Sequence, residues 1–156
     1  MEAYIEKFGY IGILAGTFLE GETTVLIGGI LSKLGYMNIY KVFIFAFIGT
    51  FAGDFTFFSV GKVFGRSIVD KYEFLSSKVP IADKIIKKHG SFIVFIIRFL
   101  VGVRAVVLVL LGCTNIKVSK FFLFSIANSI LWSLVVSAIG YVFGNVVYMI
   151  VKDIKQ

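Results

Sequence analysis

Four long apolar runs follow one another along the chain, and a polar stretch separates the first two from the last two. The runs cover roughly 8–32, 39–64, 91–113 and 121–151, and the polar stretch covers 66–89. A helix needs about 20 apolar residues to cross a bilayer core about 30 Å thick, whereas the strands of a membrane barrel alternate in character over about ten residues. The continuous runs therefore predict an all-α integral membrane protein.

The polar stretch carries a weaker helical pattern of its own. Ile81, Ile85 and Ile86 recur among lysines at the spacing of one helical face. This pattern predicts a short amphipathic linker helix that lies in the membrane interface.

Charged residues interrupt the first and third runs. Glu20 and Glu22 lie two positions apart, and Arg98 and Arg104 lie six positions apart. On a straight helix the members of these pairs would point roughly 200° and roughly 120° apart. A charge at the bilayer centre costs about 2.5–3.5 kcal/mol or more, so a straight span that turns one member of a pair toward lipid is disfavoured.

Glycines beside these charges offer a different geometry. A break at Gly21 and another at Gly102 would let both charges of each pair turn inward, toward protein or a watery cavity. Each run then forms a re-entrant hairpin, and a hairpin followed by one span makes an odd number of crossings. We therefore expect an inverted repeat of re-entrant helical hairpin plus transmembrane helix, with four plain spans as the alternative.

Matches between the two halves of the chain agree with a repeat. Residues 18–22 (FLEGE) correspond to 99–103 (FLVGV), and residues 61–65 (GKVFG) correspond to 140–144 (GYVFG). We expect one membrane domain that includes the whole chain. Its parts are repeat 1 at about 7–65, the basic linker at 66–89 and repeat 2 at about 90–151, within a single domain 1–156.

Composition and charge place this domain in a membrane. The chain is 58% hydrophobic and carries a net charge of +7, and its mean hydropathy is +0.96. Basic residues gather in and near the linker: Lys62, Arg66, Lys71, Lys78, Lys84, Lys87 and Lys88. Short basic loops stay on the cytoplasmic side, where the lipid surface is anionic. We expect a multi-pass protein of the cell membrane with a cytoplasmic linker and no nucleic-acid partner.

Arg98 and Arg104 are the candidates for substrate binding. A guanidinium presents a planar fork of donors to phosphate or carboxylate and stays charged when desolvated. The N–H groups at a broken helix also favour an anion. The structural alternative is that these arginines only pair with Glu20 and Glu22 and hold the hairpins together.

Glu20, Glu22 and Asp54 are the acids of the apolar runs. A carboxylate balanced between an apolar cavity and a nearby arginine could load and release a proton. These acids are therefore candidates for proton coupling or for charge pairing.

Other chemistry finds little support. His89 and Cys113 are the single histidine and the single cysteine, so we expect no metal site, no nucleophile–base pair, no cofactor and no enzymatic activity. Small residues such as Gly49 and Gly53 predict close helix packing, within the chain or in a homodimer.

Taken together, these motifs resemble one family. Residues 98–104 (RFLVGVR) resemble the second-hairpin signature of the DedA family, also known as VTT or SNARE-associated domain proteins. Residues 18–22 (FLEGE) resemble the first hairpin of that family, and 53–54 (GD) with 61–66 (GKVFGR) are similar to its following span. The resemblance covers roughly 7–145.

The resemblance implies two re-entrant hairpins that face each other and a functional set of Glu20, Glu22, Asp54, Arg98 and Arg104. Members of the family are implicated in undecaprenyl phosphate recycling, in phospholipid scrambling and in maintaining the proton-motive force. We therefore expect a flippase or scramblase-type transporter of an anionic membrane lipid, above all undecaprenyl phosphate, with protons as the candidate coupling ion. The alternatives are a proton-coupled transporter of small solutes or osmolytes and a membrane scaffold that transports nothing.

Overall fold

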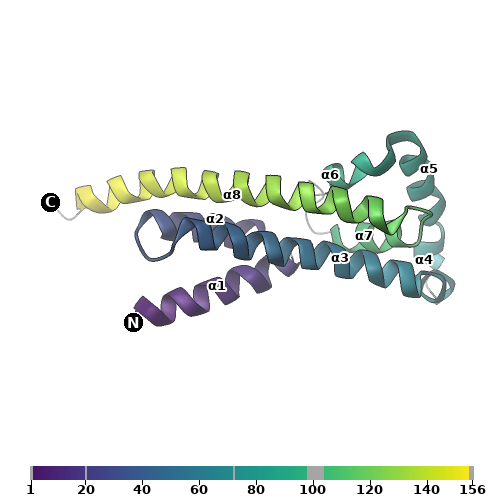
Figure 1. Ribbon diagram of the computed structural model, residues 1–156, viewed down its shortest axis with the longest axis horizontal. Coiled ribbons are helices and arrows are strands. Elements are labelled where there is room, and N and C mark those ends of the chain that lie inside the picture. Colours follow the sequence, from purple (N-terminus) through teal and green to yellow (C-terminus); the bar gives the residue numbers. More distant parts are fainter. Residues whose placement is uncertain (1, 20, 72, 98–103, 155–156) are drawn as a thin grey trace. The chain divides into compact units, whose positions relative to one another are not determined.

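The computed structural model describes residues 2–19, 21–71, 73–97 and 104–154. Within these ranges the chain forms helices and short turns, without a strand, so the all-helical fold predicted from the sequence is confirmed there. The elements are α1 (Glu2–Leu19), α2 (Glu22–Lys33), α3 (Ile39–Lys71), α4 (Glu73–Ser76), α5 (Val79–His89), the 3-10 turn η1 (Gly90–Phe92), α6 (Ile93–Ile97), α7 (Arg104–Gly112) and α8 (Val118–Ile154) (Figure 1).

Two of these helices are long and apolar enough to cross a membrane. The apolar part of α3 is Ile39–Gly65, and that of α8 is Val118–Ile150. At 1.5 Å per residue these stretches are about 40 Å and about 50 Å long, which exceeds a bilayer core of about 30 Å. They lie where the second and fourth apolar runs predicted spans.

The first apolar run forms two short antiparallel helices instead of one long helix. The helix is interrupted at Gly21, so that α2 is 12 residues long, or about 18 Å. Beside the interruption, a Cβ atom on Gly16 would lie 2.6 Å from Thr24. At the far end, the backbone N–H of Asn38 donates to the hydroxyl of Tyr10 at 2.8 Å. Tyr10, near the start of this run, therefore lies beside the turn that follows α2.

Contacts divide the chain into two compact units. Unit 1 contains the chain up to Phe51 and the chain from Ser129 onward, whereas unit 2 contains Ala52–Asn128. Because α3 and α8 each contribute one part to unit 1 and the other part to unit 2, neither unit coincides with one sequence repeat.

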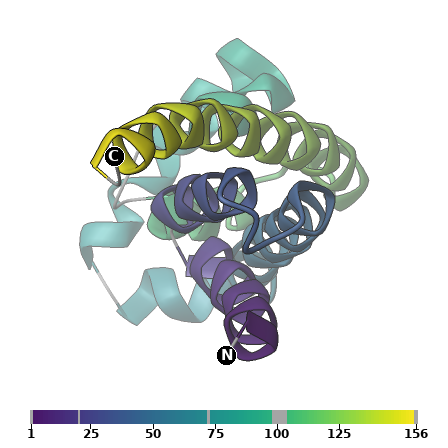
Figure 2. The ribbon, with the colours of Figure 1, turned by 90° about the vertical axis from the view of Figure 1, so that its left-hand side faces the viewer.

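In unit 1, α2 lies between α1 and the C-terminal half of α8 (Figure 2). A Cβ atom on Gly29 would lie 2.8 Å from the Cα atom of Gly140, so the backbones of α2 and α8 approach closely. Gly49 of α3 packs in the same way against Thr17 of α1. The apolar core of this unit consists of Tyr10, Ile13, Val25, Met37, Val42, Ala46 and Val136.

In unit 2, the second half of α3 packs against α7 and the start of α8. The rings of Phe58 and Phe121 stack with their centroids 3.8 Å apart. A Cβ atom on Gly61 would overlap the carbonyl of Val109, so only glycine permits this approach. The buried core residues are Phe58, Val94, Leu108, Leu111, Ile116 and Phe121.

The polar linker contains helix α5, which has one apolar face. Ile86 packs against the core of unit 2, while the neighbouring lysines Lys84, Lys87 and Lys88 are exposed. A helix therefore forms where the isoleucine pattern predicted an amphipathic one.

The loop after α7 is fastened to α3. The Nζ atom of Lys62 donates to the carbonyl oxygen of Thr114 at 2.8 Å and to that of Ile116 at 3.1 Å. Asn115 of this loop and Asp83 of α5 line one cavity. The chain therefore returns, after α7, to the place where it entered the third apolar run.

Candidate functional site

An arginine and an aspartate form a buried ion pair in unit 2. Asp54 lies in the apolar part of α3, and Arg104 is the first residue of α7. Their side chains are only 3% and 12% exposed. Neither charge could be buried this deeply alone, because an uncompensated charge in an apolar interior is very costly.

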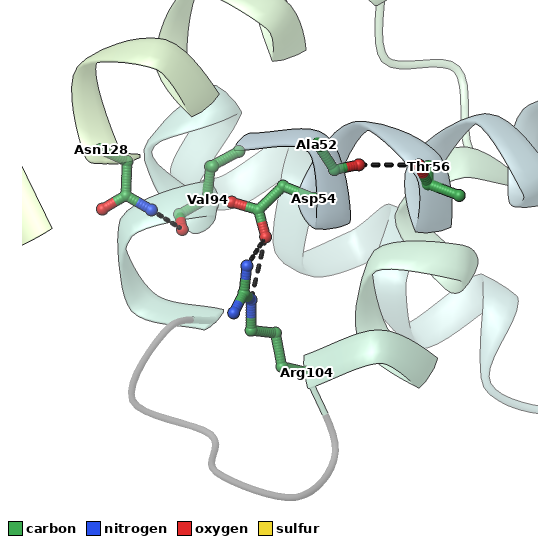
Figure 3. Close-up of polar contacts among 6 residues, drawn as sticks. All are labelled: Ala52, Asp54, Thr56, Val94, Arg104 and Asn128. Atoms are coloured by element: carbon green, nitrogen blue, oxygen red, sulfur yellow. Dashed lines mark hydrogen bonds and ion pairs between the residues drawn. The ribbon is translucent and has the colours of Figure 1, made fainter. Parts of the chain in front are cut away.

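The pair is held by two hydrogen bonds to one oxygen. Nε of Arg104 donates to Oδ1 of Asp54 at 2.9 Å, and Nη2 of Arg104 donates to the same oxygen (Figure 3). This geometry fixes the guanidinium plane against α3. It also sets the direction in which the fork of donors faces.

The position of Arg104 on its helix matters for ligand chemistry. The N-terminus of a helix carries partial positive charge and unpaired N–H groups, so it disfavours a cation and favours an anion. Asp54 supplies the negative charge that this end of α7 requires. An anionic ligand that reached the same place would satisfy both the arginine and the helix end.

Further polar groups are buried in the same unit. Nδ2 of Asn128 donates to the carbonyl oxygen of Val94 at 3.1 Å, which joins α8 to α6 (Figure 3). The hydroxyl of Ser125, one helical turn earlier, is buried without a hydrogen-bond partner among the described residues. Unit 2 thus combines an ion pair with buried polar side chains in an otherwise apolar core.

The candidate residues from the sequence fall into three groups. Arg104 and Asp54 are brought together. Glu22 and Gly21 lie in unit 1 at the start of α2, where a Cβ atom on Gly21 would overlap the backbone of Thr17. Glu20, Arg98 and Gly102 lie outside the described residues.

Two polar residues of unit 2 were not singled out as site candidates from the sequence. Asn128 is an amide inside a long apolar run, and that rarity was a usable signal. Lys62 was counted with the basic linker because of its charge. Its bonds to two loop carbonyls depend on a chain reversal that no local pattern reveals.

Metal binding finds no support in the described part of the chain. No group of three or more histidine, cysteine, aspartate or glutamate side chains is close enough there to hold an ion.

Comparison with known proteins relates most of the chain to one domain. The VTT domain matches residues 19–142. No solved structure gives a significant match.

Several curated relatives are membrane proteins. The inner membrane protein YohD of Escherichia coli (strain K12) is 27% identical over 100% of this chain and 81% of its own length. Protein DedA of the same organism is 23% identical over 92% of this chain and 68% of its own length. Undecaprenyl phosphate transporter A of Staphylococcus aureus (strain NCTC 8325 / PS 47) is 23% identical over 83% of this chain and 71% of its own length.

Proposed function

Because the chain belongs to the VTT-domain family of membrane proteins, the DedA family, we propose that it moves an anionic lipid across the cell membrane. Arg104 holds the phosphate of that lipid. The observation that carries this proposal is the ion pair between Arg104 and Asp54, buried in an apolar unit at the start of α7.

In this proposal Arg104 exchanges one partner, the carboxylate of Asp54, for another, the phosphate of the lipid. Without lipid, Asp54 compensates the charge of Arg104 and the pair tolerates its burial. A phosphate group matches the guanidinium fork and competes with the carboxylate for it. Once displaced, Asp54 would lose the compensating charge of Arg104, and taking up a proton would offset that loss. This exchange links lipid binding to proton uptake.

Residues outside this pair complete the proposal. Arg98 supplies a second set of donors to the phosphate. Glu20 and Glu22 serve in proton coupling or charge pairing on the first hairpin. Gly21 and Gly102 allow the chain to reverse within the membrane.

The proposed topology is an inverted repeat of re-entrant hairpin plus transmembrane helix. Three observations support it: α2 is too short to span a bilayer, Tyr10 meets Asn38, and Asp83 shares a cavity with Asn115. Each hairpin would then leave the membrane on the side where it entered. The basic linker 66–89 would lie in the cytoplasm, as its charge favours. Whether the protein forms a homodimer stays a prediction.

The proposed lipid is a polyprenyl phosphate, with undecaprenyl phosphate as the first candidate. The name of the Staphylococcus aureus relative, an undecaprenyl phosphate transporter, supports this choice. A monophosphate head group fits a site built around arginine, while the prenyl tail can stay in the lipid throughout the movement.

Translocation in liposomes tests the proposal. The purified protein is reconstituted, labelled undecaprenyl phosphate is added to the outer leaflet, and its arrival in the inner leaflet is followed with a membrane-impermeant quencher. We expect translocation well above that of protein-free vesicles, and a loss to near background for Arg104→Ala. Arg104→Lys keeps the charge without the fork and should retain only part of the rate.

The matched control is Lys84→Ala, which removes a positive charge from an exposed position on α5 and should leave the rate unchanged. Translocation equal to that of protein-free vesicles would contradict the flippase reading and favour a scaffold. Uptake of a labelled osmolyte driven by a proton gradient, without lipid movement, would support the small-solute transporter instead.

A further inference from the structure

A cavity of about 360 Å³ opens on unit 2 beside the linker helix. Its walls come from α5, from the loop after α7 and from the start of α8. Lys87, Lys117 and Lys120 line it, together with Asp83 and Asn115. We refer to these three lysines and the cavity between them as the lysine cleft. None of its lining residues belongs to the pair of Arg104 and Asp54.

The lysine cleft has a strong excess of positive charge. Three lysines but only one acidic residue, Asp83, are among the described residues that line it. Among the described residues, no acidic side chain forms an ion pair with Lys87, Lys117 or Lys120. Helix α8 begins at Val118 beside the cleft, and the N-terminus of so long a helix adds partial positive charge and unpaired N–H groups.

The backbone that forms the walls of the lysine cleft is held in place by core packing and by a hydrogen bond. Ile116 lines the cavity and is also buried in the apolar core of unit 2. Its carbonyl oxygen accepts a hydrogen bond from Lys62, which holds the loop against α3. At the other wall, Gly90 ends α5 with a φ of 60° and a ψ of −151°, a conformation open only to glycine. The lysines are therefore presented by anchored backbone rather than by a free loop.

The outer surface of α5 indicates where a ligand would come from. Ile81 and Ile85 are 50% and 38% exposed, and lysines flank them along the helix. A helix with exposed isoleucines among lysines lies in the membrane interface, with its apolar side chains toward the acyl chains and its charges among the head groups. The lysine cleft would then open at the level of lipid phosphates.

We propose that the lysine cleft binds the phosphate-bearing head group of an anionic membrane lipid. The ligand is a lipid and not soluble phosphate, because the isoleucines beside the cleft would place it against the bilayer. Binding here does not depend on Arg104, so the cleft is a second anion site and is independent of the transport proposal.

Native mass spectrometry of the detergent-solubilised full chain tests this proposal. The protein is titrated with phosphatidic acid, and phosphatidylcholine serves as a lipid without net charge. We expect tighter binding of phosphatidic acid, and binding about tenfold weaker in the double variant Lys117→Gln/Lys120→Gln, because each lysine near a lipid phosphate contributes substantially to its attraction. Asp83→Asn removes the opposing charge and should strengthen binding, a gain that a misfolded protein would not show.

Two controls make the result decisive. The double variant Lys84→Gln/Lys88→Gln removes the same charge from exposed positions of α5 outside the cavity lining, and it should bind phosphatidic acid like the original protein. Lys71→Gln, at an exposed position at the end of α3 outside the cavity lining, should do the same. An equal loss of phosphatidic acid binding in both double variants would show that the lipid is attracted by surface charge in general and not by the lysine cleft. Displacement of phosphatidic acid by an equal concentration of inorganic phosphate would overturn the assignment of a lipid ligand.

Discussion

Arg104 places two of its nitrogen donors on a single oxygen of Asp54, across 50 residues of sequence. The contact joins the start of α7 to the middle of α3; Asp54 is buried and the side chain of Arg104 is only 12% exposed. The ion pair therefore contributes to the packing of unit 2 as well as to its chemistry. Its removal should have consequences for stability that can be separated from those for transport.

Removing one partner of this pair should destabilise the protein strongly. Arg104→Ala removes the arginine that compensates the buried carboxylate of Asp54, and such a loss costs about 3–5 kcal/mol. The double variant Arg104→Met/Asp54→Leu replaces the pair by apolar groups and should recover most of that loss. Unfolding with denaturing detergent in mixed micelles measures the free energies. Additive losses in the double variant would contradict a direct coupling of the two residues.

Glycines at the helix contacts should not tolerate even a methyl group. A Cβ atom on Gly61 would overlap the carbonyl of Val109, and one on Gly112 would lie 2.7 Å from the backbone nitrogen of Lys62. Overpacking of this kind costs about 1–3 kcal/mol. Gly61→Ala and Gly112→Ala should therefore lower the thermal unfolding temperature measured by circular dichroism.

Gly12→Ala is the matched control for the glycine variants. A Cβ atom there would meet nothing within 4 Å. Alanine is a better helix former than glycine by about 1 kcal/mol, so this variant should unfold at the same temperature or a higher one. A fall comparable to that of Gly61→Ala would show that the loss of glycine itself, and not the close contact, is responsible.

Lys62 should stabilise the loop after α7. Lys62→Met keeps much of the aliphatic chain but removes the donor to the carbonyls of Thr114 and Ile116. The lysine is exposed, so we expect a loss of only about 1 kcal/mol. Hydrogen exchange should also become faster in the loop. Lys71→Met, an exposed lysine at the end of the same helix, should leave both measurements unchanged.

Labelling of Lys84→Cys and Asn115→Cys from each side of the membrane should distinguish re-entrant hairpins from plain spans. In a Cys113→Ser background, we expect Lys84→Cys and Asn115→Cys to react with an impermeant maleimide from the same side. Tyr36→Cys should react from the opposite side. Four plain spans would separate Lys84 from Asn115, whereas both topologies separate Lys84 from Tyr36, which makes Tyr36→Cys the control.

Much of the fold could be predicted from the sequence because its signals are local. Long apolar runs gave the two membrane-length helices, and the isoleucine spacing of Ile81, Ile85 and Ile86 gave the helix in the linker. The charges beside Gly21 indicated an interruption, which lies where α1 gives way to α2. Each of these features depends on residues within a few helical turns of one another.

Which acid pairs with which arginine could not be predicted in the same way. The sequence marked Glu20, Glu22 and Asp54 as acids that could pair with the arginines, but it left open which acid pairs with which arginine. The described partner of Arg104 is Asp54. That choice depends on how α3 and α7 are placed by contacts such as Gly61 against Val109, and such contacts between distant segments have no signature in a single sequence.

The composition of unit 1 has a consequence for how the protein is made. Its first hairpin packs against Gly140, which the ribosome produces more than a hundred residues later. A nascent chain that has reached Asn128 contains all of unit 2 but lacks the last part of unit 1. Helices α1 and α2, the first to be made, therefore complete their packing only after the last helix has been made, and a chain truncated before Gly140 would lack the contact between α2 and α8.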